Sequence, residues 1–384
     1  MAGPRRVGAA ASLSIVIFVL AACDEPGAPP GCGYGDGARP VAGSFLSWNV
    51  YLGASVQPLI RADSTEWAAI VEAGFQQVLQ TNFAERATTI AGRIDAVDPD
   101  LIGLQEVAHW LVQSPGDEST TNPTPATETV ADFLAILLSA LEARGLAYDA
   151  VVVTTNVDIE LPSASGGDVR FKDRDVILAR TGVATLNPRS GGFQARFSFA
   201  GFTVVRGWAS IDAVIDGDTV RFTTTHLETE ELERLLGLQR DQVNELLATW
   251  CDANLPLVVT GDFNSDPRDT TTAAYGALTS AGFVDAWSAA GTGTPGFTCC
   301  QSADLSNATS ALSQRVDQVF FRGAARVIDA ALLGADPGER TPSGLWPSDH
   351  AGVFATLRPL PPGRLGRCGR LLLKETPPGG CVDK

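Results

Sequence analysis

The segment from Val258 to Pro267, Val-Val-Thr-Gly-Asp-Phe-Asn-Ser-Asp-Pro, constrains this chain more than any other. An apolar run followed at once by a glycine turn predicts a buried strand that ends near Asp262. Asp262 and Asn264 are two residues apart, so their side chains lie on the same side of an extended chain. A carboxylate and an amide at a strand end can reach one hard cation and one phosphate oxygen together. The pattern favours metal-assisted phosphoester chemistry, although an Asx-type turn that only ends a strand would share it.

The composition permits a large globular domain with an acidic surface. Hydrophobic residues make up 45% of the 384 residues, which is enough for a sizeable core and argues against global disorder. The net charge of −16 repels nucleic acid unless basic groups or divalent ions intervene. Tight DNA binding is therefore disfavoured, whereas transient hydrolysis of a phosphodiester is compatible with this charge.

The N-terminus has the features of an export signal. Two arginines precede an apolar run that is short for a transmembrane span and ends in Leu20-Ala-Ala-Cys23. This ending resembles a bacterial lipobox, which implies cleavage before Cys23 and acylation of its thiol; an ordinary signal peptide with an incidental cysteine is the alternative. We expect a lipoprotein signal peptide over 1–22 and a flexible tether over 23–43. The protein would be exported to the bacterial cell envelope, lipid-anchored to a membrane or secreted.

Seven cysteines fit an exported protein. Apart from Cys23, they are Cys32, Cys251, Cys299, Cys300, Cys368 and Cys381. They could form disulfides in an oxidising compartment, but the sequence does not determine the pairing. Since adjacent cysteines rarely bond each other, we expect Cys299 and Cys300 to have different partners. A cysteine-bound structural metal is disfavoured because no C-x-x-C pair occurs.

Strand-like and helical segments alternate through residues 44–358. The spacing of apolar residues predicts helices over 60–97, where a second helix begins at residue 84. Two more helices are predicted over about 130–144 and about 229–250. Strand-like runs include 45–50, 101–106, 148–154, 175–180, 183–187, 203–214, 219–226 and 256–261. Strands outnumber helices, which favours two helix-covered sheets over one doubly wound parallel sheet. No change of composition divides this range, so we expect one catalytic domain over 44–358 and a C-terminal extension over 359–384.

Polar residues stand at the ends of several apolar strands, where burial is costly unless the side chain serves a function. They are Asn49, Glu106, His226, Asp262, Asn264, Asp317, Asp349 and His350. Each alone has a structural explanation. A terminal Glu can be solvated, a strand His can be a hydrogen-bonded core residue, and an Asp before a His can be a cap. The joint pattern is much harder to attribute to chance.

In this order the segments resemble the endonuclease/exonuclease/phosphatase superfamily, which has the DNase I-like fold. The matching motifs are Trp48-Asn49, Gln105-Glu106, His226 after a threonine run, Gly261-Asp-Phe-Asn264, Asp317 and Ser348-Asp-His350. The resemblance covers about residues 44–358. It implies an α/β fold, a four-layer α/β/β/α sandwich of two mixed β-sheets flanked by helices, with the active site on strand ends and loops at one edge.

The resemblance also implies a role for each matching residue. Glu106 would be the main ligand of a divalent metal, with Asn49, Asp262 and Asp349 as further ligands. Asp262 and Asn264 would orient the attacking water and a phosphate oxygen.

The two histidines would move protons. His350, paired with Asp349, would accept or relay one. His226 would hydrogen-bond the scissile phosphate or protonate the leaving oxygen, and Asp317 would tune one of the histidines.

Two further assignments rest on position within the resemblance. Asp173 would pair with the strand histidine, with Asp175 as the alternative and a charged turn as the structural explanation. Arg206 would bind the substrate phosphate, a task that suits a bidentate guanidinium, with a surface ion pair as the alternative. The acidic run from Glu228 to Glu233 is expected to form a solvated face at the start of a helix, where anions are favoured.

These residues suit hydrolysis of a phosphodiester, which builds negative charge that a bound divalent metal neutralises. Mg²⁺ prefers a few oxygen ligands, so a Glu with an Asn suits it; Mn²⁺ and Ca²⁺ are alternatives. Histidine titrates near neutrality and can supply acid and base.

We therefore expect a monomeric, metal-dependent phosphoric ester hydrolase, anchored to a membrane by lipid. Its phosphoester substrate would be a nucleic acid or a phospholipid head group, as for a nuclease or a sphingomyelinase-like phosphodiesterase. A catalytically silent binding module on the same fold is the alternative, and the complete residue set argues against it.

Overall fold

The structure, a computed structural model, describes residues 39–360 except 122, 200–201, 230–234, 236, 251–253 and 269–271. The expected signal peptide with Cys23, most of the tether and nearly all of the C-terminal extension lie outside the described residues. Residues 39–43, assigned from sequence to the tether, pack against the domain. Pro40 forms a β-bridge with Ala324, and Val41 is fully buried.

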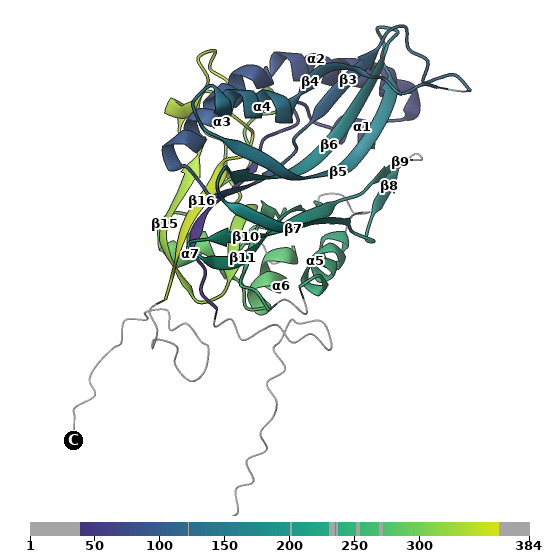
Figure 1. The fold of residues 1–384 in the computed structure, drawn as a ribbon. Helices are drawn as coiled ribbons and strands as arrows, with labels where there is room; N and C mark the ends of the chain where they lie inside the picture. Colours follow the sequence, from purple (N-terminus) through teal and green to yellow (C-terminus); the bar gives the residue numbers. More distant parts are fainter. Residues whose placement is uncertain are drawn as a thin grey trace, which may run out of the picture.

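Two mixed β-sheets form the centre of the molecule (Figure 1). The larger sheet has the order β15 (Ala325–Leu333), β16 (Gly352–Pro359), β1 (Gly43–Asn49), β2 (Leu101–Gln105), β6 (Asp168–Arg180), β3 (His109–Gln113) and β4 (Glu128–Asp132), and β5 (Tyr148–Pro162) pairs with β6. The smaller sheet has the order β13 (Val284–Asp285), β14 (Asp317–Arg322), β12 (Leu257–Asp262), β11 (Asp218–His226), β10 (Gly207–Ile215) and β7 (Ala184–Gly192). β1 runs parallel to β2 and β11 to β12.

Helices cover the outer face of each sheet (Figure 1). The helices α2 (Trp67–Gln80), α3 (Phe83–Val97) and α4 (Phe133–Glu142) lie over the larger sheet, and α5 (Leu238–Ala248) and α6 (Ala274–Ser280) lie over the smaller one. The shorter elements are α1 (Gln57–Arg61), α7 (Ala286–Ala290), β8 (Phe197–Phe199) and β9 (Phe202–Val204). None of the described helices has the length and apolar character needed to cross a membrane.

Alternation along the strands produces these layers, because successive side chains point to opposite faces. Phe45 packs between the two sheets, whereas its neighbour Leu46 joins the core under α2–α4. In the other sheet, Val258 lies between the sheets and Val259 packs under α5 and α6. The four-layer α/β/β/α sandwich expected from the sequence is confirmed.

The space between the sheets becomes polar toward the ends of β2 and β12. The Gln105 side-chain amide donates to the Thr224 hydroxyl at 2.8 Å. A Cβ on Gly103 would overlap the hydroxyls of Thr224 and Thr260, so glycine is required for the sheets to approach here. This polar layer leads directly to Asn49 and Asp262.

One helix is shorter than the sequence pattern suggested. The periodicity predicted a helix over about 229–250, but α5 begins at Leu238, after Gly237 in a left-handed conformation (φ 81°). The chain is irregular from Leu227 to Thr229 after β11, and this places Glu228 beside the site described next.

Candidate active site

Strand register brings the predicted polar residues to one edge of the sandwich. His226 ends β11 opposite Asp262 at the end of β12, and Asp262 in turn lies opposite Asp317 at the start of β14. In the other sheet, Asn49 lies opposite Gln105, with Glu106 directly after it. Because β1, β2, β11 and β12 all end at this edge, residues far apart in sequence share one site.

Asn49 links the two carboxylates from opposite sheets. Its amide nitrogen donates to Glu106 Oε1 at 3.0 Å and to Asp262 Oδ2 at 3.1 Å. Its oxygen accepts from the Tyr51 backbone at 3.0 Å. In this arrangement Asn49 positions the two carboxylates through its nitrogen. A metal would have to bind the side-chain oxygen of Asn49, and that oxygen is turned to the Tyr51 backbone instead. The Leu52 amide donates to the other Glu106 oxygen at 2.9 Å.

The carboxyl groups are crowded and buried. Burial and the charge of Asp173 raise the pKa of Glu106. Burial and Asp317 raise the pKa of Asp262 to about 7, against the opposing effect of His350. Burial also raises the pKa of Asp349 to about 7; His350 opposes this and Glu106 adds to it. Such a concentration of acidic groups favours a bound cation.

Two of these residues have unusual backbone geometry. Glu106 and Asn264 have φ values of 58° and 47°, in the left-handed region. Asparagine tolerates this region, whereas for glutamate it is uncommon and tends to occur at functional sites. The turn directs Glu106 from the end of β2 into the site.

His350 is paired with Asp317. The distance from His350 Nδ1 to Asp317 Oδ2 is 2.7 Å, and the distance to Asp262 Oδ2 is 3.8 Å. Burial lowers the pKa of His350, but Asp317, Asp262 and Asp349 outweigh it and raise this pKa well above the usual value. The expected pairing of His350 with Asp349 is wrong, because the hydrogen-bond partner of His350 Nδ1 is Asp317.

His226 is held by Arg206, and Asn264 lies beside the ring. Arg206 Nη1 lies 2.9 Å from His226 Nδ1, and Asn264 Nδ2 lies 3.4 Å from His226 Nε2. Arginine only donates, so Nδ1 is the acceptor and the proton of the neutral ring is on Nε2, which lies 3.5 Å from Asp262 Oδ2. Burial and the charges of Arg206 and His350 lower the pKa of His226 well below its usual value.

Arg206 occupies a buried ion-pair network. It lies 3.4 Å from Glu228 and 3.6 Å from Asp173. Asp173 therefore contacts His226 only through Arg206, whereas direct pairing was expected. Asp175, the alternative, is fully buried and does not line the site cavity. Glu228 is also buried, so its expected place on a solvated face is wrong; its position just after the buried pair His226-Leu227 was the available signal.

Cys299 and Cys300 are bonded to each other, contrary to the expectation of separate partners. Cys300 Sγ lies 3.9 Å from His350 Nε2. Sequence separation alone gave no signal for this pairing. The other cysteines lie outside the described residues.

The donor set fits a hard divalent cation. Asp262 and Asp317 place carboxylate oxygens within 4.8 Å of each other, and His350 completes this cluster as the hydrogen-bond partner of Asp317. Asp317 Oδ1 is buried and has no hydrogen-bond partner among the described residues. Glu106 and Asp262 are joined by one amide, and carboxylate oxygens are the ligands that Mg²⁺, Mn²⁺ and Ca²⁺ prefer.

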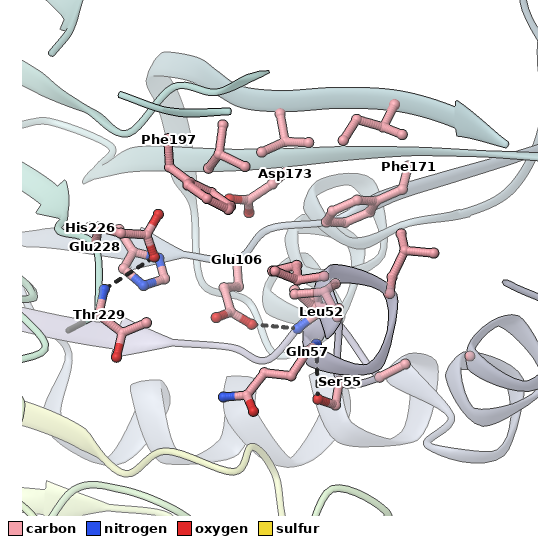
Figure 2. Close-up of a pocket in the computed structure, with 18 of the residues that line it drawn as sticks. Leu52, Ser55, Gln57, Glu106, Phe171, Asp173, Phe197, His226, Glu228 and Thr229 are labelled. Carbon is pink, nitrogen blue, oxygen red and sulfur yellow. Dashed lines mark hydrogen bonds between the residues drawn. The ribbon is translucent and has the colours of Figure 1, made fainter. Parts of the chain in front are cut away.

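Several residues of the site line one cavity of about 320 Å³. Glu106, His226, Asp262 and His350 form its polar end, together with Asn264. Figure 2 shows Glu106 near the middle, with His226 and Glu228 on one side and Leu52 and Phe171 on the other. The structure thus brings together Asn49, Glu106, Asp173, Arg206, His226, Asp262, Asn264, Asp317 and His350, with Asp349 close behind.

Comparisons with known proteins agree with this geometry. The family model described as Endonuclease/Exonuclease/phosphatase family matches residues 46–350. No match was found among the curated proteins. Among solved structures, a protein of this family from Bacteroides thetaiotaomicron is 16% identical, with a TM-score of 0.53 over 83% of this chain and 98% of that chain.

Two further structures have the same fold. A family protein from Leptotrichia buccalis is 17% identical, with a TM-score of 0.52 over 82% of this chain and 99% of that chain. A mannosyl-6-phosphatase from Bacteroides thetaiotaomicron is 16% identical, with a TM-score of 0.50 over 82% of this chain and 98% of that chain. Since the family match spans most of the chain, this protein belongs to the endonuclease/exonuclease/phosphatase family, whose members are phosphoesterases.

Proposed function

We propose that this protein is a divalent-metal-dependent phosphoesterase that hydrolyses a phosphodiester by attack of water. The observation that carries the proposal is the convergence of Glu106, His226, Asp262 and His350 on one cavity. No two of these residues are close in sequence, and each is held by partners in the same site.

Glu106 and Asp262 would hold the metal, with Asp349 as a further carboxylate, and Asn49 would keep the first two in place. The metal, when bound, supplies positive charge that stabilises the phosphate oxygens in the transition state. We favour Mg²⁺, with Mn²⁺ or Ca²⁺ as alternatives. Members of this family generally depend on a divalent metal.

The chain's own residues supply the proton transfers. Water attacks phosphorus, a new P–O bond forms, and the ester P–O bond breaks. The Asp262 carboxylate, which lies beside both histidines, can orient the attacking water and accept its proton. The His350–Asp317 pair carries a proton because the pKa of His350 is raised, and it can donate this proton to the leaving oxygen.

His226 would act on a nonbridging oxygen, with Arg206 supporting it from behind. His226 stays neutral and presents Nε2–H toward the polar end, where it can donate to a phosphate oxygen. Asn264 orients Asp262, whose Oδ1 accepts from the Asn264 backbone amide at 3.0 Å. Arg206 fixes the His226 tautomer and adds positive charge behind it.

A substrate panel with controlled metal tests this proposal. It would contain plasmid DNA, sphingomyelin, a simple aryl phosphodiester and a phosphomonoester, each with Mg²⁺, Mn²⁺, Ca²⁺ or chelator. We expect hydrolysis that stops with the chelator and returns with metal. His350→Ala should fold normally and lose turnover. A catalytically silent binding module would instead hydrolyse none of these compounds, and its ligand binding would be unaffected by His350→Ala.

We also propose that the protein is exported and anchored through acylated Cys23. The support is the apolar N-terminal run and its Leu20-Ala-Ala-Cys23 ending. Mass spectrometry of the mature N-terminus tests this proposal. An unmodified N-terminus at any other residue would contradict the anchor.

A further inference from the structure

The catalytic cavity continues into an apolar cleft. One wall, the helix wall, consists of Leu59, Ile60, Ile70, Val71 and Phe75 from α1 and α2. The opposite wall, the strand wall, consists of Val157, Ile159, Leu161, Val169 and Phe171 from β5 and β6. Both walls belong to the same cavity as Glu106 and His350. Figure 2 shows Phe171 and Leu52 lying beyond Glu106, away from His226.

The strand wall is apolar because every second side chain along this part of β5 is apolar and points to the same face. Val157, Ile159 and Leu161 are two residues apart, so they point to the same face of β5. Phe171 stacks on Trp110 with ring centroids 4.6 Å apart, and Phe75 lies 6.3 Å from the same ring. An apolar surface of this kind beside a catalytic centre is costly to leave in water and is typical of a ligand site.

The charges around the cavity disfavour a polyanion. Arg206 is the one arginine or lysine among the described residues that line it, and Glu228 and Asp173 already pair with it. The other charged groups include Glu106 and Asp262, which are acidic. A nucleic acid strand needs cations for its flanking phosphates, and the described lining of the cleft offers none besides Arg206.

The cleft also has open space at the helix wall. Gly74 lies in α2, lines the cavity, and a Cβ built on it would meet no atom within 4 Å. The total volume of about 320 Å³ is within the range of small-ligand pockets.

We propose that the apolar cleft binds the hydrocarbon chain of an amphiphilic phosphoester whose phosphate lies at the polar end, a specificity that rests on the proposed function. Because the two walls and the catalytic residues line the same cavity, we assign the hydrocarbon chain in the cleft to the substrate itself. The apolar walls stabilise the chain by removing it from water, and the polar end is where the ester bond is cleaved.

A chain-length series tests the proposal on the full-length protein with metal. The substrates are 4-nitrophenyl alkyl phosphodiesters with methyl, butyl, octyl and dodecyl groups, kept below their micelle concentrations. We expect kcat/KM to rise by about two- to fourfold for each methylene that enters the cleft, until the cleft is full. Alkylphosphonates of the same lengths, which have no ester to cleave, measure binding without turnover.

Gly74→Leu and Gly276→Leu form a matched pair. Both glycines lie in helices and both have open space at the Cβ position, but only Gly74 lines the cavity. Gly74→Leu should reduce the dodecyl-to-methyl ratio of kcat/KM at least tenfold, because the new side chain fills the cleft. Gly276→Leu should keep the ratio of the unmodified protein.

The outcomes separate the two proposals. Hydrolysis of all esters at rates independent of chain length would overturn the cleft assignment and leave the phosphoesterase function standing. So would a Gly74→Leu variant that changes the oligomeric state but not the chain-length ratio, because the cleft would then be an interface between copies. No hydrolysis of any ester, together with tighter binding of longer alkylphosphonates, would overturn the catalytic function and support the cleft assignment.

Discussion

His350 Nδ1 and Asp317 Oδ2 lie 2.7 Å apart in a buried pair contributed by two different sheets. Asp317 starts β14 of the smaller sheet, whereas His350 lies just ahead of β16 of the larger one, separated from it by Ala351. The pair therefore forms only when the two sheets are packed against each other. The proton transfer that we assign to this pair therefore depends on correct packing of the two sheets.

Asp317→Asn should lower kcat by about 100-fold or more, because the amide cannot hold the protonated imidazole and the proton transfer is lost. The side chain keeps its size, so the fold should be retained. Steady-state kinetics and circular dichroism check this result. Asp329→Asn on the exposed part of β15 is the matched control. More than half of the activity remaining in Asp317→Asn would refute the role of the pair.

Arg206→Met should lower the free energy of unfolding by about 3–5 kcal/mol, since it leaves the buried carboxylates of Glu228 and Asp173 without their partner. Adding Glu228→Gln should recover part of this loss. Chemical denaturation measures both variants. The matched control is Arg240→Met, whose ion pair is exposed and should change stability by less than about 0.5 kcal/mol. Equal effects of the two arginine substitutions would contradict the network.

Metal should stabilise the protein more at pH 8 than at pH 6. Asp262 and Asp349 have pKa values raised from 3.8 to about 7, so the folded metal-free state binds more protons than the unfolded state between about pH 4 and 7. The stability of the metal-free protein therefore falls as pH rises through this window, while protons compete less with metal.

At a metal concentration of about 100 times Kd, the stabilisation should be about 2.7 kcal/mol, or roughly 5–10 °C in Tm. Differential scanning fluorimetry with Mg²⁺ or Mn²⁺ against chelator measures it. Asp262→Asn should remove most of the shift. A Tm that does not respond to metal at either pH would argue against the metal site.

Gly103→Ala should destabilise the protein by about 1–3 kcal/mol, because the new methyl group overlaps Thr224 and Thr260 between the sheets. Gly276→Ala is the control and should be neutral or stabilising by up to about 1 kcal/mol, since its helix position is open. Urea unfolding compares the two. A neutral Gly103→Ala would show that the sheets separate easily at this point.

The strand ends could be predicted from the sequence because each is an apolar run closed by a polar residue. Asn49, Glu106, His226, Asp262 and Asp317 were all identified in this way, and their order carried the family resemblance. Alternation along the strands then places them at one edge of two packed sheets.

Pairing within the site could not be predicted, because it depends on side-chain direction after packing. Asp349 precedes His350 in sequence, yet Asp317 from another sheet forms the hydrogen bond. Glu228 appeared to begin a helix, but the chain stays irregular there and buries it against Arg206.

The apolar cleft could not be predicted from the sequence either. Val157, Ile159 and Leu161 form a regular strand pattern that would look the same beneath a packed helix. The cavity arises from the way α1 and α2 pack beside these strands, and tertiary packing cannot be read from the strand pattern.

The most direct test of the central claim is a metal titration of phosphodiester hydrolysis by metal-stripped protein, compared with Glu106→Gln. We predict no activity without metal, saturable activation of the unmodified protein by Mg²⁺ or Mn²⁺, and little or no activation of Glu106→Gln. Full activity in chelator, or the same saturation curve for both proteins, would contradict a metal-dependent site built around Glu106.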